Sequence, residues 1–269
     1  MPDEPAVPRP AATVLLLRDA PDPVPGRTPL QVFLQRRVAG MAFAGGMTVF
    51  PGGGVDPADR PDPARWTGPD PAWWAGRLDC DEELAGAFVQ AAVRETYEEC
   101  GVLLAGPDTA AVPAGARADL VARRRTLADV LAAAGLHLRA DLLAPWSRWV
   151  TPEESPRRYD TVFLAARVPD GQAADAHTTE AVEATWWHPA EALERWQRGE
   201  LELMAPTVRT LQEIDEHADA GAVLAAAAQR RVRPRIPRVR REGERVVVVV
   251  GGDDGFEVAA GHLRPGDHR

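Results

Sequence analysis

One acidic helix end constrains this chain more than any other stretch. Residues 81–100 are rich in strong helix formers, with acids at 81–83 where a helix would begin and Gly101 where one would end. Glu95, Glu98 and Glu99 are spaced i, i+3 and i+4, so their carboxylates share one helix face. The same face carries the apolar residues Leu84, Phe88, Ala91, Ala92 and Val102. A solvated acidic pair is the ordinary alternative, but three carboxylates on a core-facing stripe favour a divalent cation with oxygen ligands.

A glycine-rich segment lies upstream of this helix. Its sequence is Phe50-Pro51-Gly52-Gly53-Gly54-Val55-Asp56. It predicts a brief strand at 47–50 and a turn at 52–54, where backbone without side chains can approach a phosphate closely. Glycine-rich turn and acidic helix together favour chemistry on a phosphate group rather than a purely structural role.

At these residues the sequence resembles the Nudix hydrolases, whose signature is G-x5-E-x7-R-E-U-x-E-E-x-G-U, with U a bulky apolar residue. The second half is present as Arg94-Glu95-Thr96-Tyr97-Glu98-Glu99-Cys100-Gly101-Val102. The first half resembles Gly53 followed by Asp59. Asp59 stands where the family has Glu, Thr96 stands where an apolar residue is usual, and residues 60–93 number 34 where the family has 7. A signature split in this way is similar to the subgroup that includes the animal coenzyme A diphosphatases, and the resemblance extends from about residue 11 to about residue 211.

The resemblance implies a fold and a site. The fold is an α/β/α sandwich on a mixed sheet, which the alternation of strands and helices also favours. The implied catalytic residues are Arg94, Glu95, Glu98 and Glu99, with the three glutamates as ligands of Mg²⁺ or Mn²⁺. Arg94 would orient Glu95 or meet a substrate phosphate. Glu99, Glu98 and an acid from the region of residue 180 remain alternatives for the general base, and Asp59 is an open alternative as a further ligand.

A further acid often comes from a loop in this family, and here Glu180 or Glu183 would supply it. His188 precedes a proline, which favours a turn residue over a ligand. The implied substrate-binding residues are Arg37, Gly52, Gly53, Arg157 and Arg158. The two arginines at 157 and 158 would grip phosphate bidentately, or form an ordinary solvated basic turn.

The implied reaction is metal-dependent hydrolysis of a nucleoside diphosphate derivative, with coenzyme A or an acyl-coenzyme A as the first choice. Of the coenzyme A motif upstream of the glycines, Arg37 and Gly46 are in place, while Ala42 and Ala44 stand where Arg and His are expected. The alternative is a pyrophosphatase for a dinucleotide, a nucleotide sugar or a nucleoside triphosphate. A nucleotide-sensing protein without hydrolysis is disfavoured because all three helix acids are retained.

The remaining periodicity defines the expected domains. We expect a flexible N-terminus at 1–10, a Nudix domain at 11–218 with insertions at 60–80 and 105–145, and a C-terminal extension at 219–269. Strands are predicted at 13–17, 30–36, 162–168 and 245–250, and helices at 118–134, 190–198, 207–217 and 220–229. Residues 60–76 are expected to be an ordered loop whose tryptophans, Trp66, Trp73 or Trp74, form a wall or lid of the substrate cleft.

Composition limits the partners and the compartment. A net charge of −9 over 269 residues argues against general nucleic-acid or anionic-membrane binding. Two cysteines fit a reducing cytoplasm, and no leader, peroxisomal address or membrane span is expected. Seven arginines between residues 230 and 241 read as a solvated arm. The alternative is that they fold back toward an anionic substrate or a partner subunit, as in a homodimer.

Overall fold

The computed structural model describes residues 5–22, 24–40, 44–107, 112–176, 181–242, 245–250 and 257–259. The principal strands and helices, in chain order, are β1 (Arg9–Asp19), β2 (Leu30–Arg37), β3 (Thr48–Val49), β4 (Gly52–Gly54), β5 (Trp66–Thr67), α1 (Pro71–Leu78), α2 (Glu82–Cys100), β6 (Ala105–Gly106), α3 (Ala116–Val121), α4 (Leu127–Ala134), β7 (His137–Arg139), β8 (Leu143–Val150), β9 (Tyr159–Arg167), β10 (Ala181–Trp187), α5 (Pro189–Gln197), α6 (Ala205–Asp215), α7 (Ala220–Gln229), β11 (Pro234–Arg235), β12 (Pro237–Glu242), β13 (Arg245–Val250) and β14 (Glu257–Ala259).

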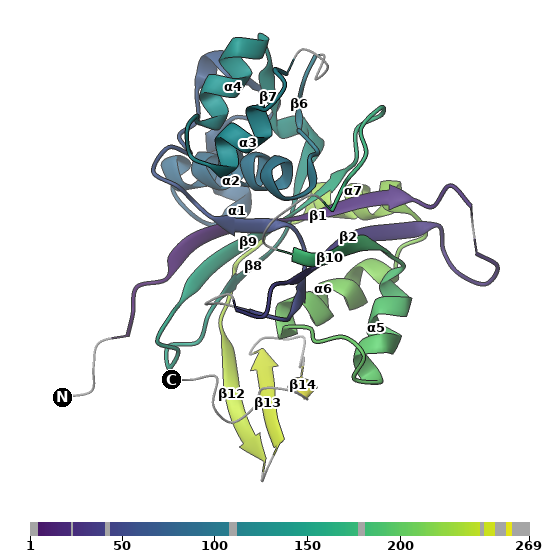
Figure 1. Ribbon diagram of the computed structural model, residues 1–269. Helices are drawn as coiled ribbons and strands as arrows, with labels where there is room; N and C mark the ends of the chain where they lie inside the picture. Colours follow the sequence, from purple (N-terminus) through teal and green to yellow (C-terminus); the bar gives the residue numbers. More distant parts are fainter. Residues whose placement is uncertain are drawn as a thin grey trace.

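A mixed sheet forms the centre of the molecule, with the strand order β10-β2-β1-β9-β8-β11. β1 pairs with β9 in parallel and with β2 antiparallel. β8 is antiparallel to β9, and β11 is parallel to β8. Two shorter sheets, β5-β7-β6 and β12-β13-β14, lie outside this layer, and the second extends away from the main body (Figure 1).

Helices cover both faces of the sheet, as Figure 1 shows with α1–α4 above it and α5 and α6 below. The side chains of β1 alternate between the two layers. Val14 and Leu16 pack with Phe88 of α2, whereas Leu15 and Leu17 pack with the helices of the opposite face. This arrangement confirms the predicted α/β/α sandwich on a mixed sheet.

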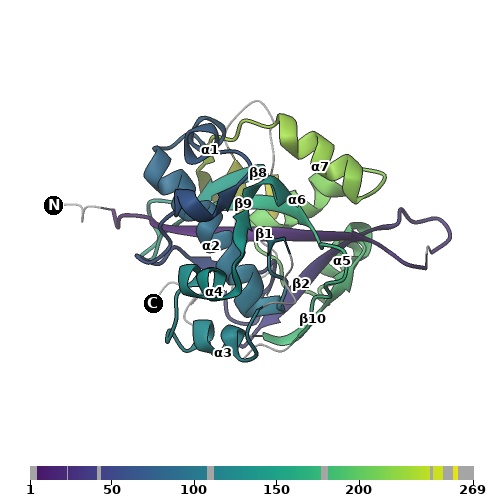
Figure 2. The same cartoon turned by 90° about the horizontal axis from the view of Figure 1, so that it is seen from above.

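One edge of β1 is shared by two partners, and this division positions the site. β2 pairs with residues 17–19 of β1, and β4 pairs with residues 11–13. The helix α2 lies over β1 (Figure 2). The three glycines of β4, predicted as a turn, are therefore a short strand at the sheet edge beneath α2. Gly52 is required there because a Cβ would lie 2.4 Å from the carbonyl oxygen of Ala12.

The segment between the two halves of the signature differs from the prediction of a loop. It contains the helix α1, which Asp70 caps by accepting from the backbone N–H of Trp73 at 2.8 Å. Trp74 is fully buried in the same apolar cluster as Phe88. Of the three tryptophans named as alternatives for a wall of the substrate cleft, Trp74 is therefore excluded, because its indole packs in the core beside α2, whereas Trp66 and Trp73 are partly buried.

One other prediction needs correction, and two strands were not predicted. The helix predicted at 118–134 is two helices, α3 and α4. Arg123 takes a positive φ of 54° between them, and Thr126 begins α4 with a capping box to Asp129. The strands β8 and β10 were not predicted from their sequences. β8 holds Arg148 inside the sheet, where Asp160 of β9 pairs with it at 2.6 and 2.8 Å.

The arginine-rich segment starts as part of the folded body. The guanidinium of Arg230 lies 3.6 Å from the ring centre of Trp146, and that of Arg235 lies 5.4 Å from Trp149. Both arginines also pair with Glu213 of α6, at 2.9 and 3.2 Å. These contacts give the two arginines a structural role in holding β11 against β8. None of the helices in the described ranges is long and apolar enough to cross a bilayer.

Candidate active site

Local sequence fixes both ends of α2. Asp81 accepts from the backbone N–H of Leu84 at 2.8 Å, and two glutamates follow in the first turn. Gly101 ends the helix in the left-handed region, with φ of 74°, and donates its N–H to the carbonyl of Tyr97. The predicted helix is thus confirmed to within one residue, and its last turns carry the three signature glutamates.

Three successive glycines of β4 contact three signature residues of α2. The N–H of Gly52 donates to Glu99 Oε2 at 2.7 Å. A Cβ on Gly53 would lie 2.5 Å from Glu95 Oε1. The carbonyl of Gly54 accepts from Arg94 at 2.8 Å. Any side chain at position 53 would displace the Glu95 carboxylate, so the glycine run is what allows the acidic face to lie directly against backbone.

Arg94 is the ionic centre of the site. It forms a bidentate pair with Asp59, at 2.9 and 2.8 Å. Its Nη1 also donates to Glu95 at 2.7 Å and to Glu98 at 3.2 Å. Asp59 is buried and accepts in addition from the N–H of Asp56. The structure therefore uses Asp59 to hold Arg94, across an insertion that separates them by 34 residues in the sequence.

Glu99 lies deeper than the other two acids, with 3% of its surface exposed. It accepts a hydrogen bond from the side-chain amide of Gln35 in β2. Sequence reasoning did not single out Gln35. The signal that could have found it is an amide directly after the apolar run Val32, Phe33 and Leu34 of β2.

Burial and mutual charge set the electrostatics of the site. Burial raises the pKa of Glu95 to about 7, with Arg94 acting in the opposite direction and Glu98 adding to the rise. Burial also raises the pKa of Glu98, against the charge of Arg94. For Arg94, burial acts to lower the pKa, but the bonds to Asp59 and the surrounding carboxylates outweigh it and the pKa is raised. Positive charge is thus stabilising at this face.

The donor set fits a hard divalent cation in its chemistry. Across the ranges the structure describes, no three acidic, histidine or cysteine side chains already converge as a metal cluster. Arg94 bridges Glu95 and Glu98 instead, and Glu99 bonds to Gln35 and Gly52. All donors are carboxylate oxygens on neighbouring turns of one helix, the ligand type that Mg²⁺ and Mn²⁺ prefer.

The predicted substrate-binding residues differ in placement. Gly52 and Gly53 lie against the acids, and Arg37 ends β2, where its N–H donates to the carbonyl of Met47. Arg157 is exposed in the turn before β9. Arg158 is buried, and its guanidinium donates to the carbonyls of Ala6 and Thr151, each at 3.0 Å. Those two bonds give Arg158 a structural function in closing the turn.

Of the two candidates for the additional acid, the structure describes only Glu183, which is not brought to the triad. Glu183 is exposed on β10 and pairs with Arg36 at 3.4 Å. Arg36 and Gln35 are successive residues of β2, so their side chains point to opposite faces of the sheet. Glu183 therefore lies across the sheet from Glu99. Glu180 lies outside the described residues. His188 begins α5, and its Nδ1 contacts the carbonyl of Leu30 at 3.1 Å, in agreement with a turn residue.

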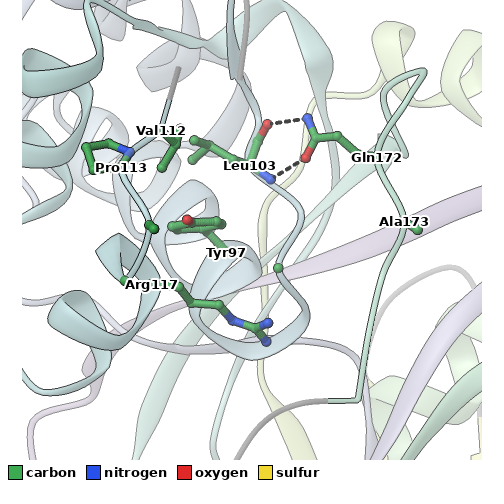
Figure 3. A pocket seen from close by; sticks show the side chains of 10 residues that line it. Tyr97, Leu103, Val112, Pro113, Arg117, Gln172 and Ala173 are labelled. Atoms are coloured by element: carbon green, nitrogen blue, oxygen red, sulfur yellow. Dashed lines mark hydrogen bonds between the residues drawn. The ribbon is translucent and has the colours of Figure 1, made fainter. Parts of the chain in front are cut away.

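A pocket of about 380 Å³ opens beside the C-terminal end of α2 (Figure 3). Tyr97 and Arg117 line it, and the amide of Gln172 bonds to both the N–H and the carbonyl of Leu103, at 2.8 and 2.9 Å. Tyr97 follows Glu95 by two residues, a rotation of roughly 200° about the helix axis. The pocket is therefore on the side of α2 away from the carboxylates and is separate from the acidic site.

The raised pKa of Glu95 predicts a pH dependence for the metal-free protein. Between about pH 4.5 and about pH 7 the folded state holds a proton on Glu95 that the unfolded state has lost. Stability is therefore highest below this window and falls as pH rises through it, by an amount on the order of 3 kcal/mol for this group. Urea unfolding at pH 5, 6 and 7 should show this fall in wild type and a smaller one in Glu95→Gln. An equal fall in both proteins would contradict the assignment, and Glu83→Gln, in the exposed first turn of α2, is the control.

Known proteins provide an independent comparison with this geometry. The family model of the NUDT19 Nudix domain matches residues 80–214, which is half of the chain. The chain is 28% identical over 202 residues to putative nudix hydrolase 7 from Caenorhabditis elegans, covering 72% of this chain and 58% of that protein. It is 28% identical over 248 residues to acyl-coenzyme A diphosphatase NUDT19 from Gallus gallus, covering 74% and 65%. The chain thus spans about three fifths of the length of these relatives.

A solved structure agrees with the sequence relatives. The crystal structure of a NUDIX hydrolase from Alicyclobacillus acidocaldarius superposes with a TM-score of 0.64 at 28% identity, covering 82% of this chain and 96% of the other. The resemblance noted in residues 94–102 is therefore accompanied by a structural match over 82% of the chain. The chain belongs to the Nudix hydrolase family, within the group defined by the NUDT19 Nudix domain.

Proposed function

We propose that this protein hydrolyses the diphosphate linkage of coenzyme A or an acyl-coenzyme A. The observation that carries the reaction class is the contact of Gly52, Gly53 and Gly54 with Glu99, Glu95 and Arg94. The contact places a carboxylate face beside backbone that has no side chains, which gives a diphosphate room to approach. The substrate choice is supported by the NUDT19 family match and by the Gallus gallus relative, whose name is that of an acyl-coenzyme A diphosphatase.

Glu95, Glu98 and Glu99 would hold Mg²⁺ or Mn²⁺. Bound there, the cation would neutralise charge on the diphosphate and lower the pKa of a bound water. The protein contributes the positions of the three acids. Gly52 and Gln35 hold Glu99 by donating hydrogen bonds to its carboxylate. Arg94 aligns Glu95 and Glu98, and Asp59 anchors Arg94. The bidentate pair with Asp59 leaves Arg94 anchored even when a cation takes over its contacts with the glutamates.

Product analysis tests the substrate choice. Coenzyme A, acetyl-coenzyme A, dephospho-coenzyme A, a dinucleotide and a nucleotide sugar are each incubated with the protein and Mg²⁺, and the products are separated by chromatography. Release of adenosine 3′,5′-bisphosphate from coenzyme A is the expected result. Intact coenzyme A beside ready cleavage of another nucleotide diphosphate would remove this substrate and favour a different Nudix pyrophosphatase.

Arg157 gives a sharper prediction about the 3′-phosphate. At the N-terminal end of β1, Arg9 pairs with Tyr159 of β9 and Ala11 pairs with Gly54 of β4. The turn that contains Arg157 therefore lies beyond the same end of the sheet as β4. If Arg157 binds the 3′-phosphate, Arg157→Ala should lower kcat/KM for coenzyme A by roughly ten- to a hundredfold, the scale of a charge-assisted hydrogen bond.

Dephospho-coenzyme A is the matched substrate control for this prediction, because it lacks the 3′-phosphate. Its kcat/KM should change little in the variant. Arg198→Ala is the control variant, since Arg198 follows α5 on the other helical layer and pairs with Glu200. An equal loss on both substrates would show that Arg157 does not read the 3′-phosphate.

A further inference from the structure

The side chain of Gln35 is a polar group where the fold favours an apolar one. It follows Leu34 in β2, pairs across the sheet with Ala184 of β10 and Val49 of β3, and has 1% of its surface exposed. Its Oε1 has no hydrogen-bond donor among the residues that the structure describes. A buried acceptor without a donor costs free energy, and an apolar side chain of similar size would avoid that cost. Packing of β2 against α2 therefore does not account for an amide at this position.

The side-chain amide of Gln35 donates a hydrogen bond to Glu99. Its Nε2 donates to Glu99 Oε2, and the N–H of Gly52 donates to the same oxygen at 2.7 Å. One donor comes from the middle of the sheet and the other from the glycine strand. Two donors that converge on one oxygen define both the rotation of the carboxylate and the direction of its other oxygen.

We propose that Gln35 is a positioning residue of the cation site: it holds the Glu99 carboxylate in the orientation from which that carboxylate binds a divalent cation. This inference rests on the assignment of Glu99 as a ligand under the proposed function. Hydrogen bonds of this kind orient the ligands of metal sites, and their loss weakens metal binding without removing any ligand. Gln35 itself contacts neither substrate nor cation in this role.

The chain offers a matched control in the same strand. Gln31 is also an amide of β2, but its partners are Arg18, at 2.8 Å, and His188, at 3.4 Å. Neither partner belongs to the acidic site. Gln31→Leu and Gln35→Leu therefore make the same chemical change four residues apart in one strand, and only the second removes a donor to a signature glutamate.

Mn²⁺ binding to the full chain is measured by titration calorimetry without substrate, and metal-free unfolding is followed by heat. Gln35→Leu should raise the Kd for Mn²⁺ at least about tenfold. Its metal-free unfolding should stay cooperative, because Gln35 Oε1 has no donor to lose and Glu99 keeps the hydrogen bond from Gly52. Gln31→Leu should leave the Kd within about twofold of wild type. Gln35→Met, which keeps the length of the side chain, should show the same loss of Mn²⁺ affinity. It replaces the leucine variant in the measurement if the leucine variant does not fold.

A Kd within twofold of wild type in the folded Gln35 variant would overturn the proposal. The same loss in Gln31→Leu, or a wild-type protein that binds no Mn²⁺, would overturn it as well. The substrate assignment is tested separately by coenzyme A cleavage. A protein that shows the Gln35 effect on Mn²⁺ but leaves coenzyme A intact would support the role of Gln35 and remove only the substrate.

Discussion

Glu98→Gln and Glu99→Gln are each expected to lower kcat at least about a hundredfold in saturating Mg²⁺, the scale for losing a major electrostatic contributor. An amide keeps the size of the side chain but removes the negative charge that binds the cation. Both variants should remain folded. Burial already disfavours the charged form of Glu98, and Gln at position 99 still presents an oxygen to the donors Gln35 and Gly52.

Initial rates across a range of Mg²⁺ concentrations provide the measurement, with circular dichroism to confirm the fold. Glu83→Gln is the matched control, because Glu83 belongs to the exposed first turn of the same helix. Its rate should stay near that of wild type. Near-normal rates in both Glu98→Gln and Glu99→Gln would remove these two glutamates from the list of metal ligands.

The second large effect is expected in stability. Trp74→Ala should lower the free energy of unfolding by about 3–5 kcal/mol, the usual cost of emptying a core site of this size. Trp74 is fully buried where α1 packs against α2, so its removal leaves a cavity beneath the helix that carries the acids. Urea denaturation measures the change from the transition midpoint and slope.

The neighbouring indole is a control for this stability prediction. Trp73 is only partly buried and lies 4.8 Å from the guanidinium of Arg77. Trp73→Ala should therefore cost much less than Trp74→Ala. Equal effects of the two substitutions would show that the insertion does not contribute Trp74 to the core. Replacement of residues 60–76 by a flexible linker should likewise destabilise the fold, which differs from the sequence expectation of a peripheral wall.

Local signals explain what could be predicted from the sequence. The helix α2 is specified by Asp81 at one end, Gly101 at the other and an apolar stripe between them. The sandwich follows from strands and helices with their own periodicity. The insertion was harder to interpret, because Pro, Asp and Trp resemble loop composition. Here Asp70 and Pro71 in fact begin the helix α1.

Long-range pairing explains what could not be predicted. Gln35 meets Glu99 from 64 positions away, and Asp59 meets Arg94 from 35. An arginine such as Arg148 is expected at the surface from its type alone, but here it is buried because Asp160 of β9 forms an ion pair with it. The face of the sheet on which Glu183 lies depends on the register between β10 and β2, in which Glu183 pairs with Arg36, and no local pattern reveals that register. The sequence therefore indicated the acids and Arg94 beside them, but not Gln35 as the partner of Glu99 or Asp59 as the partner of Arg94.

Metal-dependent turnover tests the central claim most directly. The wild-type protein and the double variant Glu98→Gln/Glu99→Gln are assayed against a mixture of nucleoside diphosphate derivatives that includes coenzyme A, with Mg²⁺ and with a chelator. We predict that wild type cleaves a diphosphate linkage with Mg²⁺, loses that activity with the chelator, and that the double variant stays inactive in both conditions while folded. Two results would contradict a catalytic site at the acidic face of α2. One is a wild-type protein that cleaves none of the compounds in saturating Mg²⁺, and the other is a double variant that cleaves them as fast as an active wild type.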